Sequence, residues 1–476
     1  MRSDAAALAR TTQRPWKQAA LWLAFLAPFF YLSYGVANHL AAQRADVPSV
    51  VFDWEHGLPF LAWTIFPYWS INVFYGLSPF LCRSRSEVHA HGLRLLSAQV
   101  VAVTCFLLFP LAFRFGQPEA EGAAGWLFAA LRGFDKPFNQ APSLHIALVA
   151  ILWDLYRGVL ARRWHWLLHL WALAIVVSVL TTYQHHFIDI PTGALLGWLC
   201  VWLWPLEGGG PLRAARAGLQ AGAHAAQRGV RLRLGARYAL GGMACFALAG
   251  MGAWCWANAT GDAMRWLGAS ALWLCWPGVA LGLVATNYLR VGPSGFQKST
   301  AGAMSPAARW LLAPYLLAAR LNAWAWTRGQ APAVRVNGRV WLGRQPDAAE
   351  ARRQGLAALV DVSAELPSPQ TPPLAVYCVP MLDLVPPTPA QLRAAADAID
   401  TALAAHPGDA PVLVCCALGY SRSAASVAAW LLRSGHHADI DDAIAALRTH
   451  RPQLVLHAGH RAALTALLAE PLAHTA

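Results

Sequence analysis

The sequence predicts a multi-pass α-helical membrane region followed by a cytosolic α/β domain, and three observations support that fold class. The 476 residues are 57% hydrophobic and only 13% charged, whereas soluble domains carry about a quarter charged residues. Long apolar blocks continue to about Arg290, and the remaining sequence has an ordinary soluble composition. In that second part, an apolar run at 412–414 precedes residues with helical apolar spacing, which indicates a strand followed by a helix.

Eight segments are apolar and long enough to cross a bilayer, which takes about 20 residues. The first segment follows a basic start, but its apolar core is too long for a signal peptide, so we expect a retained anchor. The expected spans are Ala19–Leu40, Leu58–Leu81, Leu93–Ala112, Ser143–Ala161, Trp164–Thr182, Phe187–Trp204, Tyr238–Ala257 and Leu267–Asn287.

Basic residues gather on alternate sides of these segments, and the positive-inside rule therefore predicts the orientation. Acidic segments near Asp46 and Glu119 fall outside, and eight spans return the C-terminal domain to the cytosol. We expect a bacterial-type inner membrane protein with both the N-terminus and the C-terminal domain in the cytosol. The basic residues expected inside are Arg2, Arg10, Arg14, Lys17, Arg83, Arg85, Arg162, Arg163 and those of 213–237.

The net charge of +13 does not indicate nucleic-acid binding, because the basic residues form no single patch. No module that combines aromatic and basic residues for nucleic-acid binding is visible either. The nine cysteines include no CxxC pair typical of zinc and no regular spacing typical of a disulfide framework. We therefore expect no metal, no cofactor and no nucleic-acid partner.

Two short polar segments lie at the outer ends of expected spans. Asn139–His145 opens the fourth span, and Tyr183–Asp189 lies between the fifth and sixth. Ionisable groups at the edge of an apolar helix are costly and usually functional. If the second segment is helical, His185 and Asp189 share one face, so the carboxylate can orient an imidazole nucleophile. His145 can then protonate a leaving oxygen. The alternative is a set of interfacial histidines beside an aromatic belt.

These two segments, with Tyr68–Ser70 and Phe109–Pro110, resemble the type 2 phosphatidic acid phosphatase superfamily, and most of all its inositolphosphotransferase-like branch. The resemblance covers residues 50–205 and implies a six-span domain over 1–205. It implies that His185 attacks phosphorus, that Asp189 orients it and that His145 is the general acid. His186 remains an alternative nucleophile.

The membrane region departs from that family in its cationic residues. The phosphatase branch carries an Arg shortly before the nucleophilic His, and Val179 stands there in this chain. Arg114 is the expected phosphate ligand, with Lys136 as a further candidate. A site with fewer cations leaves a transferase, a slow phosphatase and a degenerate domain all open.

The middle of the chain separates the two candidate sites. Residues 206–290 are expected to form a basic linker and two further spans without a catalytic group. Residues 291–333 mix apolar residues with Lys298, Arg309 and Arg320. This pattern is typical of a segment that lies on the bilayer surface, and a cytosolic helical linker is the alternative.

The strongest indication of a catalytic function in the sequence is the loop between Cys416 and Arg422. A loop between a strand and a helix N-terminus presents backbone N–H groups to an anion, and the same field favours the thiolate form of a cysteine. Arg422 offers a bidentate fork for phosphate oxygens, and Ser423 can hydrogen-bond the thiolate when it leaves. The expected substrate-binding residues of the loop are Ala417, Leu418, Gly419, Tyr420, Ser421 and Ser423.

With Val340–Arg344, Leu359–Ser363 and Arg451–Leu454, this loop resembles the dual-specificity branch of the protein tyrosine phosphatase superfamily over Val334–Leu467. The resemblance implies a domain over 334–476 in which Cys416 is the nucleophile. Asp383, on a Pro-rich loop, suits the general acid of that family, and a loop can close over substrate.

Other acidic and thiol groups near this loop have different expected roles. Asp361 lies inside a strand pattern and is expected to be structural. The family usually has His before the nucleophile, and Cys415 stands there in this chain. Cys415 and Cys378 are candidate oxidation partners of Cys416, although a vicinal disulfide would be strained and the cytosol would oppose it.

The two resemblances together predict a membrane-bound phosphatase that acts on phosphorylated lipids or lipid-linked phosphates. Its cytosolic site would use a cysteine and its periplasmic site a histidine. The alternatives are a membrane region that transfers a phospho-headgroup, a tethered protein phosphatase, and a phosphate-binding sensor with a slow or inactive site.

Overall fold

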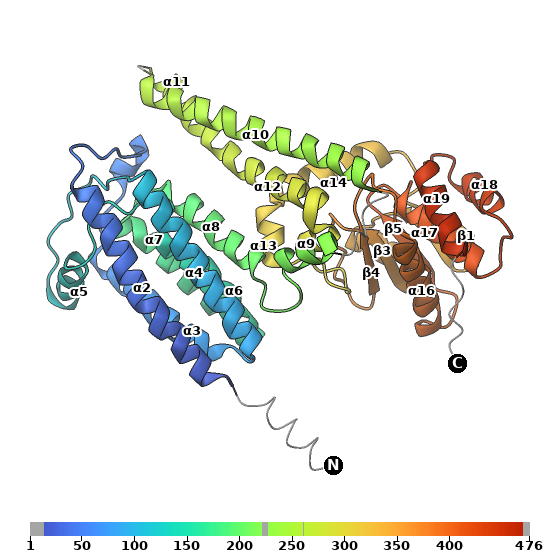
Figure 1. Cartoon of the computed structure of the whole chain (residues 1–476), viewed down its shortest axis with the longest axis horizontal. Helices are drawn as coiled ribbons and strands as arrows, with labels where there is room; N and C mark the ends of the chain where they lie inside the picture. Colours follow the sequence, from blue (N-terminus) through green and yellow to red (C-terminus); the bar gives the residue numbers. More distant parts are fainter. Residues whose placement is uncertain (1–13, 221–226, 260, 470–476) are drawn as a thin grey trace, which may run out of the picture. The chain divides into compact units, whose positions relative to one another are not determined.

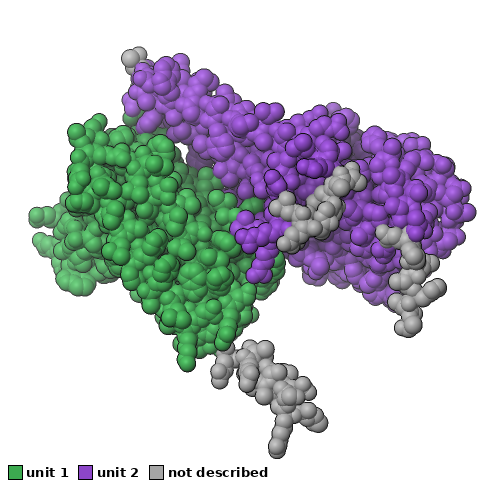
Figure 2. Space-filling view, in the orientation of Figure 1, with its two compact units in different colours: residues 1–210 green, residues 211–476 purple. Residues whose placement is uncertain are grey.

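The computed structural model describes residues 14–220, 227–259 and 261–469. Arg2 and Arg10, which contribute to the predicted orientation, lie outside the described residues. The chain divides into two compact units, Met1–Gly210 and Pro211–Ala476 (Figure 2). Three segments were expected after the six-span region, at 206–290, 291–333 and 334–476. The second unit contains the last two of them and the first from residue 211 onward.

The first unit is a helical bundle (Figure 1). A helix lies at each of the six spans expected before Trp204, and one further helix, α5, was not expected. The helices are α2 (Trp16–Ala42), α3 (Ile65–Leu81), α4 (Arg85–Leu108), α5 (Gly122–Arg132), α6 (Leu144–Val159), α7 (His165–Thr181) and α8 (Asp189–Leu203).

Among the residues that the structure describes, five helical segments are long and apolar enough to cross a membrane. They are Trp16–Ala42, Arg85–Leu108, Arg162–Thr181, Arg228–Asn258 and Ala263–Val291. The other three expected spans form the shorter helices α3, α6 and α8, of 17, 16 and 15 residues. Length and composition thus indicate membrane association, and the orientation stays a prediction.

Close packing of α6 against α8 builds one end of the first unit. A Cβ added to Gly193 of α8 would lie 2.9 Å from the Cβ of Ile146 on α6, so a larger residue would push the helices apart. Ser143 caps α6 by accepting a hydrogen bond from the Ile146 backbone N–H at 3.3 Å. The start of α8 at Asp189 is thereby held beside the start of α6.

The second unit begins with α9 (Pro211–Gln220) and a long helical hairpin. Its arms are α10 (Arg228–Asn258) and α12 (Cys275–Thr286), joined through α11 (Asp262–Ala271). Small residues allow the arms to approach, because a Cβ on Gly242 of α10 would lie 3.1 Å from the Gly278 carbonyl oxygen of α12. After a π-helical turn at Asn287–Val291, the chain continues into α13 (Pro306–Leu311) and α14 (Ala313–Thr327).

The rest of the second unit is an α/β domain with a five-stranded sheet in the order β1-β2-β5-β3-β4. Only the β1–β2 pair is antiparallel; β2–β5, β5–β3 and β3–β4 are parallel. Strands β3 and β5 are buried along their whole length, as expected for central parallel strands covered on both faces. The strands are β1 (Ala333–Asn337), β2 (Val340–Arg344), β3 (Ala358–Ser363), β4 (Ala375–Met381) and β5 (Val412–Cys416).

Helices cover both faces of this sheet. The larger core lies on one face and includes apolar residues of the helices that follow β4 and β5. A smaller core on the other face includes Ala351 of the short helix after β2. The helices are α15 (Ala348–Arg353), α16 (Pro389–Ala405), α17 (Arg422–Arg433), α18 (Ile440–His450) and α19 (Ala458–Ala469).

Candidate active sites

The loop from Cys416 to Arg422 connects the end of β5 to the first residue of α17, as the sequence pattern predicts. Gly419 has a φ of +76°, a conformation that costs other residues steric strain. A Cβ at this position would also lie 2.6 Å from the backbone nitrogen of Arg344 on β2. Only glycine therefore allows the loop to turn tightly against the neighbouring strand.

The Cys416 thiol lies inside the loop and is 2% exposed as a residue. Its sulfur accepts a hydrogen bond from the Gly419 N–H at 3.3 Å, and the Ser423 hydroxyl lies 3.3 Å away. Both donors favour a negatively charged sulfur, because hydrogen bonds to an ionised group are the stronger ones. The contacts suit a thiolate that first attacks and later leaves.

The guanidinium of Arg422, at the edge of this loop, is buried and hydrogen-bonded. Glu365 accepts two hydrogen bonds from it, at 2.6 and 2.7 Å. The Met381 carbonyl accepts a third at 2.9 Å. Glu365 lies two residues after the end of β3 and fixes the orientation of the guanidinium. No sequence motif pointed to it.

Asp383, the expected general acid, lies beside Arg422. Its carboxylate is 2.9 Å from Arg422 Nη2, and the side chain is 39% exposed. Burial raises the pKa of Asp383, Arg422 lowers it and Glu365 raises it, with a net upward direction. A raised pKa keeps the carboxyl protonated to higher pH, as proton donation requires.

Cys416, Arg422 and Asp383 open into one cavity of about 440 Å³. One wall of this cavity comes from the long helix α10. The remaining wall includes His457 and His460, which the sequence analysis did not single out. The complete lining is Val230, Arg233, Leu234, Arg237, Asp383, Leu384, Cys416, Leu418, Tyr420, Ser421, Arg422, Val455, His457 and His460.

The helical hairpin also holds the loop that carries Asp383. The Tyr288 hydroxyl, at the end of the second arm, donates a hydrogen bond to the Asp383 carbonyl oxygen at 3.0 Å. Arg231 of α10 donates to the Tyr288 carbonyl at 2.7 Å. Gln227, just before α10, donates to the Pro386 carbonyl of the same loop. The hairpin and the acid loop are thus one hydrogen-bonded assembly.

Two further contacts hold the outer part of the phosphate loop. The Tyr420 hydroxyl donates to Gln330 Oε1 at 2.6 Å, and Ser421 Oγ lies 2.8 Å from His460 Nε2. Burial, reinforced by His457, lowers the pKa of His460 to about 4, so the ring is neutral near pH 7. These side chains therefore position the loop without adding charge to it.

Cys415 and Asp361 belong to the interior and not to the cavity. Cys415 packs in the smaller core, on the opposite face of the sheet from Cys416, because successive strand residues alternate. Burial, with Asp361 nearby, raises the pKa of Cys415 well above its ordinary value. Asp361 is fully buried and pairs with Lys298 Nζ at 2.7 Å. Burial also raises the pKa of Cys378, to about 12.

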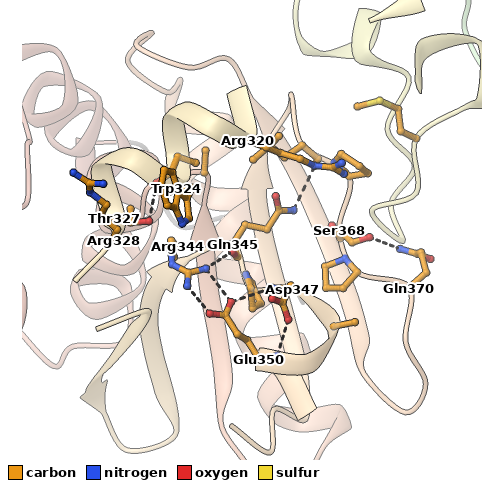
Figure 3. A pocket seen from close by; sticks show the side chains of 18 of the residues that line it. Arg320, Trp324, Thr327, Arg328, Arg344, Gln345, Asp347, Glu350, Ser368 and Gln370 are labelled. Carbon is orange, nitrogen blue, oxygen red and sulfur yellow. Dashed lines mark hydrogen bonds and ion pairs between the residues drawn. The ribbon is translucent and has the colours of Figure 1, made fainter. Parts of the chain in front are cut away.

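A larger cavity of about 940 Å³ shares no lining residue with the cavity at Cys416 (Figure 3). Arg320 and Trp324 line it from α14, Arg328 lines it directly after that helix, and Ala417 contributes from the phosphate loop. Arg344 lies within it but is paired with Glu350. No expected catalytic residue among those described lines this cavity, so we assign the chemistry to the smaller one.

In the first unit, His185 and Asp189 lie together as the second histidine segment predicts. Nδ1 of His185 is 2.9 Å from Asp189 Oδ2, and its Nε2 is 3.3 Å from the Ser143 hydroxyl. The segment forms a turn, and the helix begins only at Asp189. His185 and Asp189 therefore do not share one helix, which was the condition considered from the sequence. The turn nevertheless brings their two side chains together.

His145 and His185 line the same cavity of about 320 Å³. His145 stacks on Tyr68 with 4.1 Å between ring centroids, and its Nε2 lies 3.0 Å from the Tyr68 carbonyl oxygen. Asp135 also lines this cavity and accepts a hydrogen bond from the Tyr34 hydroxyl at 2.9 Å. Burial raises the pKa of Asp135, against the lowering effect of Tyr34 and His185.

The structure places Arg114 and His186 outside these cavities. The Arg114 guanidinium donates to the Val47 carbonyl at 2.7 Å and lines neither cavity at His185, and its role as a phosphate ligand stays a prediction. Both ring nitrogens of His186 are engaged, by Glu55 Oε2 at 3.0 Å and by the Arg114 backbone N–H at 3.3 Å. His185 lines both of the cavities at this site, and His186 lines neither of them.

Cationic side chains nevertheless reach the histidine site. A second cavity of about 200 Å³ is lined by His185, Lys136 and Arg132. Arg132 donates a hydrogen bond to Gln117 at 3.2 Å. The sequence analysis had named Lys136 as a further phosphate ligand, whereas Arg132 and Asp135 were missed because no motif contains them.

Comparison with known proteins concerns the C-terminal domain. Residues 340–468 match the family described as dual specificity phosphatase, catalytic domain. This confirms the dual-specificity phosphatase domain expected over Val334–Leu467. No curated protein matches the chain.

Several solved structures resemble the same region. Human DUSP28 is 29% identical, with 28% of this chain and 94% of that chain covered and a TM-score of 0.26. A mouse putative dual specificity phosphatase complexed with zinc tungstate is 28% identical, with coverages of 29% and 88% and a TM-score of 0.26. PTPMT1 in complex with PI(5)P is 20% identical, with coverages of 29% and 94% and a TM-score of 0.26.

Proposed function

We propose that this protein is a membrane-anchored, cysteine-dependent phosphatase that removes a phosphate monoester from a lipid or lipid-linked substrate. The observation that carries this proposal is the cavity at Cys416, which also receives Arg422 and Asp383. One wall of that cavity is α10, a helix long and apolar enough to cross a membrane. A substrate held in the bilayer can therefore reach the nucleophile.

The reaction proceeds in two displacements at phosphorus. The Cys416 thiolate attacks and forms an S–P bond, while the P–O bond to the leaving alcohol breaks and Asp383 gives that oxygen its proton. A water molecule then attacks the cysteinyl phosphate, Asp383 takes the proton of the water, and the S–P bond breaks. Arg422 binds the phosphoryl oxygens throughout. Ser423 and Gly419 stabilise the departing thiolate through their 3.3 Å contacts with sulfur.

Substrate phosphate and Asp383 compete for one guanidinium. Without substrate, Arg422 is paired with both Glu365 and Asp383. A phosphate bound in the loop takes over the Nη2 position facing Asp383, and the carboxyl is then free to turn toward the leaving oxygen. Glu365 keeps the guanidinium in place during this exchange, because its two hydrogen bonds lie on the buried side.

The substrate class is tested with the purified full-length protein in detergent micelles. Phosphate release is measured from a panel of phospholipid monoesters and from phosphopeptides at equal concentration. We expect the lipids to be hydrolysed with the higher kcat/KM. Hydrolysis of phosphopeptides without any hydrolysis of lipids would instead identify a tethered protein phosphatase.

We propose a second reaction centre at His185 in the first unit. The supporting observation is a single cavity lined by His185 and His145, with Asp189 2.9 Å from the first ring. In this proposal His185 Nε2 attacks phosphorus and His145 donates a proton to the leaving oxygen. A headgroup transferase is favoured over a phosphatase, because a singly charged diester needs fewer cationic ligands than a doubly charged monoester, and Arg114 lines neither cavity at His185.

The product distinguishes these two reactions. Incubation with a phospholipid donor and an alcohol acceptor is followed by separation of lipids, in the wild type and in His185→Ala. A new phosphodiester that disappears in His185→Ala supports transfer, whereas free phosphate supports hydrolysis. His39→Ala is the matched control, because His39 is exposed and lines neither cavity at His185. Equal products from all three proteins would contradict a reaction at His185.

A further inference from the structure

The cavity at Cys416 has a cationic wall that the two-step reaction does not use. Four residues of α10 line it at intervals of three and four, which places them on one helix face. Two of these residues are arginines, Arg233 and Arg237, and both are exposed. This wall lies across from the residues that carry out the displacement, and it belongs to a different element of the fold.

The two arginines have no acidic partner among the described residues. Arg233 makes one long hydrogen bond, 3.4 Å, to the Gly229 carbonyl of its own helix. Arg422, by contrast, is neutralised by two carboxylates, Glu365 and Asp383. The positive charge available to a second anionic group of a substrate therefore comes from Arg233 and Arg237.

The length of α10 places these arginines at the depth of lipid headgroups. Its 31 residues extend about 47 Å at about 1.5 Å per residue, whereas a hydrocarbon core is about 30 Å thick. The apolar stretch expected to cross the membrane starts at Tyr238, directly after Arg237. The first turns of α10 therefore project beyond the hydrocarbon core, beside the bilayer surface.

The rim of the cavity carries apolar side chains as well. Leu384 follows Asp383, has a φ of +57° and is 68% exposed, a combination of backbone strain and exposed apolar surface that is unusual outside functional sites. Val455 is 41% exposed on the same cavity. A wholly water-soluble substrate has no apolar group that could contact these residues. The glycerol and the first methylenes of a lipid provide such apolar groups.

We infer that Arg233 and Arg237 form a second anion subsite that binds the phosphodiester of a membrane lipid while its terminal phosphate monoester occupies the Cys416 loop. This inference rests on the proposed lipid phosphatase function and specifies its substrate class. The substrate is a lipid with two phosphates, a diester next to the diacylglycerol and a monoester farther along the headgroup. The subsite orients the lipid so that the monoester points away from the bilayer and toward Cys416.

The test measures kcat/KM for two substrates, a phosphatidylinositol monophosphate in mixed micelles and p-nitrophenyl phosphate, which has a monoester only. The ratio of the two values is compared between full-length wild type, Arg233→Gln, Arg237→Gln and the double variant. A charge-assisted hydrogen bond lost in each single variant lowers the ratio by about tenfold, and we expect a drop of about 10²-fold in the double variant.

Arg228→Gln is the matched control. It removes the same charge from the same end of α10, but Arg228 does not line the cavity. If the arginines act only by attracting the anionic surface, Arg228→Gln lowers the ratio as much as the other variants, and the inference is overturned. A ratio that stays within about twofold of wild type in the double variant overturns it as well.

The two substrates distinguish a failure of the anion subsite from a failure of the proposed lipid phosphatase function. A wild type that hydrolyses p-nitrophenyl phosphate but no lipid refutes the lipid phosphatase function itself. A wild type that hydrolyses the lipid, with an unchanged ratio in the double variant, refutes only the subsite. Residual hydrolysis of p-nitrophenyl phosphate shows that each variant is folded, and Arg233→Lys and Arg237→Lys, which keep the charge, should lower the ratio less than the Gln variants should.

Discussion

At the scale of single residues, we expect Asp383, as the proposed general acid, to determine how the reaction depends on pH. Burial raises its pKa, so the carboxyl remains protonated to higher pH than an ordinary aspartic acid. Because proton donation needs the protonated form, kcat/KM should fall as pH rises through this raised pKa.

Asp383→Asn is therefore expected to lower kcat by about 10²- to 10⁴-fold on alkyl phosphates, the usual range for a general acid. The effect should be smaller on p-nitrophenyl phosphate, whose leaving group needs no proton. The alkaline decline of kcat/KM should also disappear, because the amide does not titrate. A pH profile of the variant that keeps this decline would assign the proton donor to another residue.

Gly419 is the second residue with a specific structural requirement. Gly419→Ala adds a Cβ 2.6 Å from the Arg344 nitrogen, in addition to the strain of a φ of +76°. Gly435→Ala is a matched control, because Gly435 has a φ of +69° and open space at the Cβ position. We expect the control to cost about 1–2 kcal/mol of unfolding free energy and Gly419→Ala to cost more and to abolish phosphate release. Equal thermal midpoints for the two variants would contradict the close approach of the loop to β2.

At the scale of elements, the Tyr288 hydroxyl is one of the hydrogen-bond donors that connect the helical hairpin to the acid loop. Tyr288→Phe removes the 3.0 Å hydrogen bond to the Asp383 carbonyl and little else. Without this hydrogen bond, the loop holds the Asp383 carboxyl in its catalytic position for a smaller fraction of the time. We therefore expect kcat to fall by about tenfold, which corresponds to the free energy of one hydrogen bond. Steady-state kinetics in micelles measure this change.

A double-mutant cycle with Asp383→Asn provides the control. If Tyr288 acts through Asp383, Tyr288→Phe has little further effect in the Asp383→Asn background. An additive loss in the double variant would show that Tyr288 affects activity by another route.

Site residues that are close together in the sequence could be predicted from it, and site residues that only the fold brings together could not. Cys416 and Arg422 lie within one strand–loop–helix unit, so local pattern was sufficient to place them. His185 and Asp189 are likewise close in sequence. Glu365 and Arg233 could not be found in this way, because their roles depend on contacts between distant segments. The helical periodicity of Arg233 and Arg237 was visible, but only the fold places that face beside Cys416.

At the scale of the whole molecule, the α/β domain extends further toward the N-terminus than its sequence match. The match begins at residue 340, yet Lys298 reaches into the sheet and pairs with Asp361, with neither side chain exposed. Burial lowers the pKa of Lys298, but the Asp361 charge outweighs that effect and leaves it raised. Lys298, in the segment 291–333, thus belongs to the interior of the domain.

Lys298→Met is expected to destabilise the second unit by about 3–5 kcal/mol, because it leaves a buried carboxylate without its partner. Arg433→Met is the control. It breaks the more exposed pair with Asp397, and a surface pair contributes about 0–1 kcal/mol. Thermal unfolding of the full-length variants in detergent compares the two. Similar midpoints would show that the Lys298 contact does not stabilise the fold.

The central claim, that the chain is a phosphatase acting through Cys416, is tested most directly with three purified full-length proteins. Wild type, Cys416→Ser and His185→Ala are each assayed for phosphate release from phospholipid monoesters in micelles. We predict that Cys416→Ser loses at least about 10³-fold in kcat and that His185→Ala retains phosphate release. Persistent release by Cys416→Ser, together with its loss in His185→Ala, would contradict the claim and assign the phosphatase reaction to the first unit.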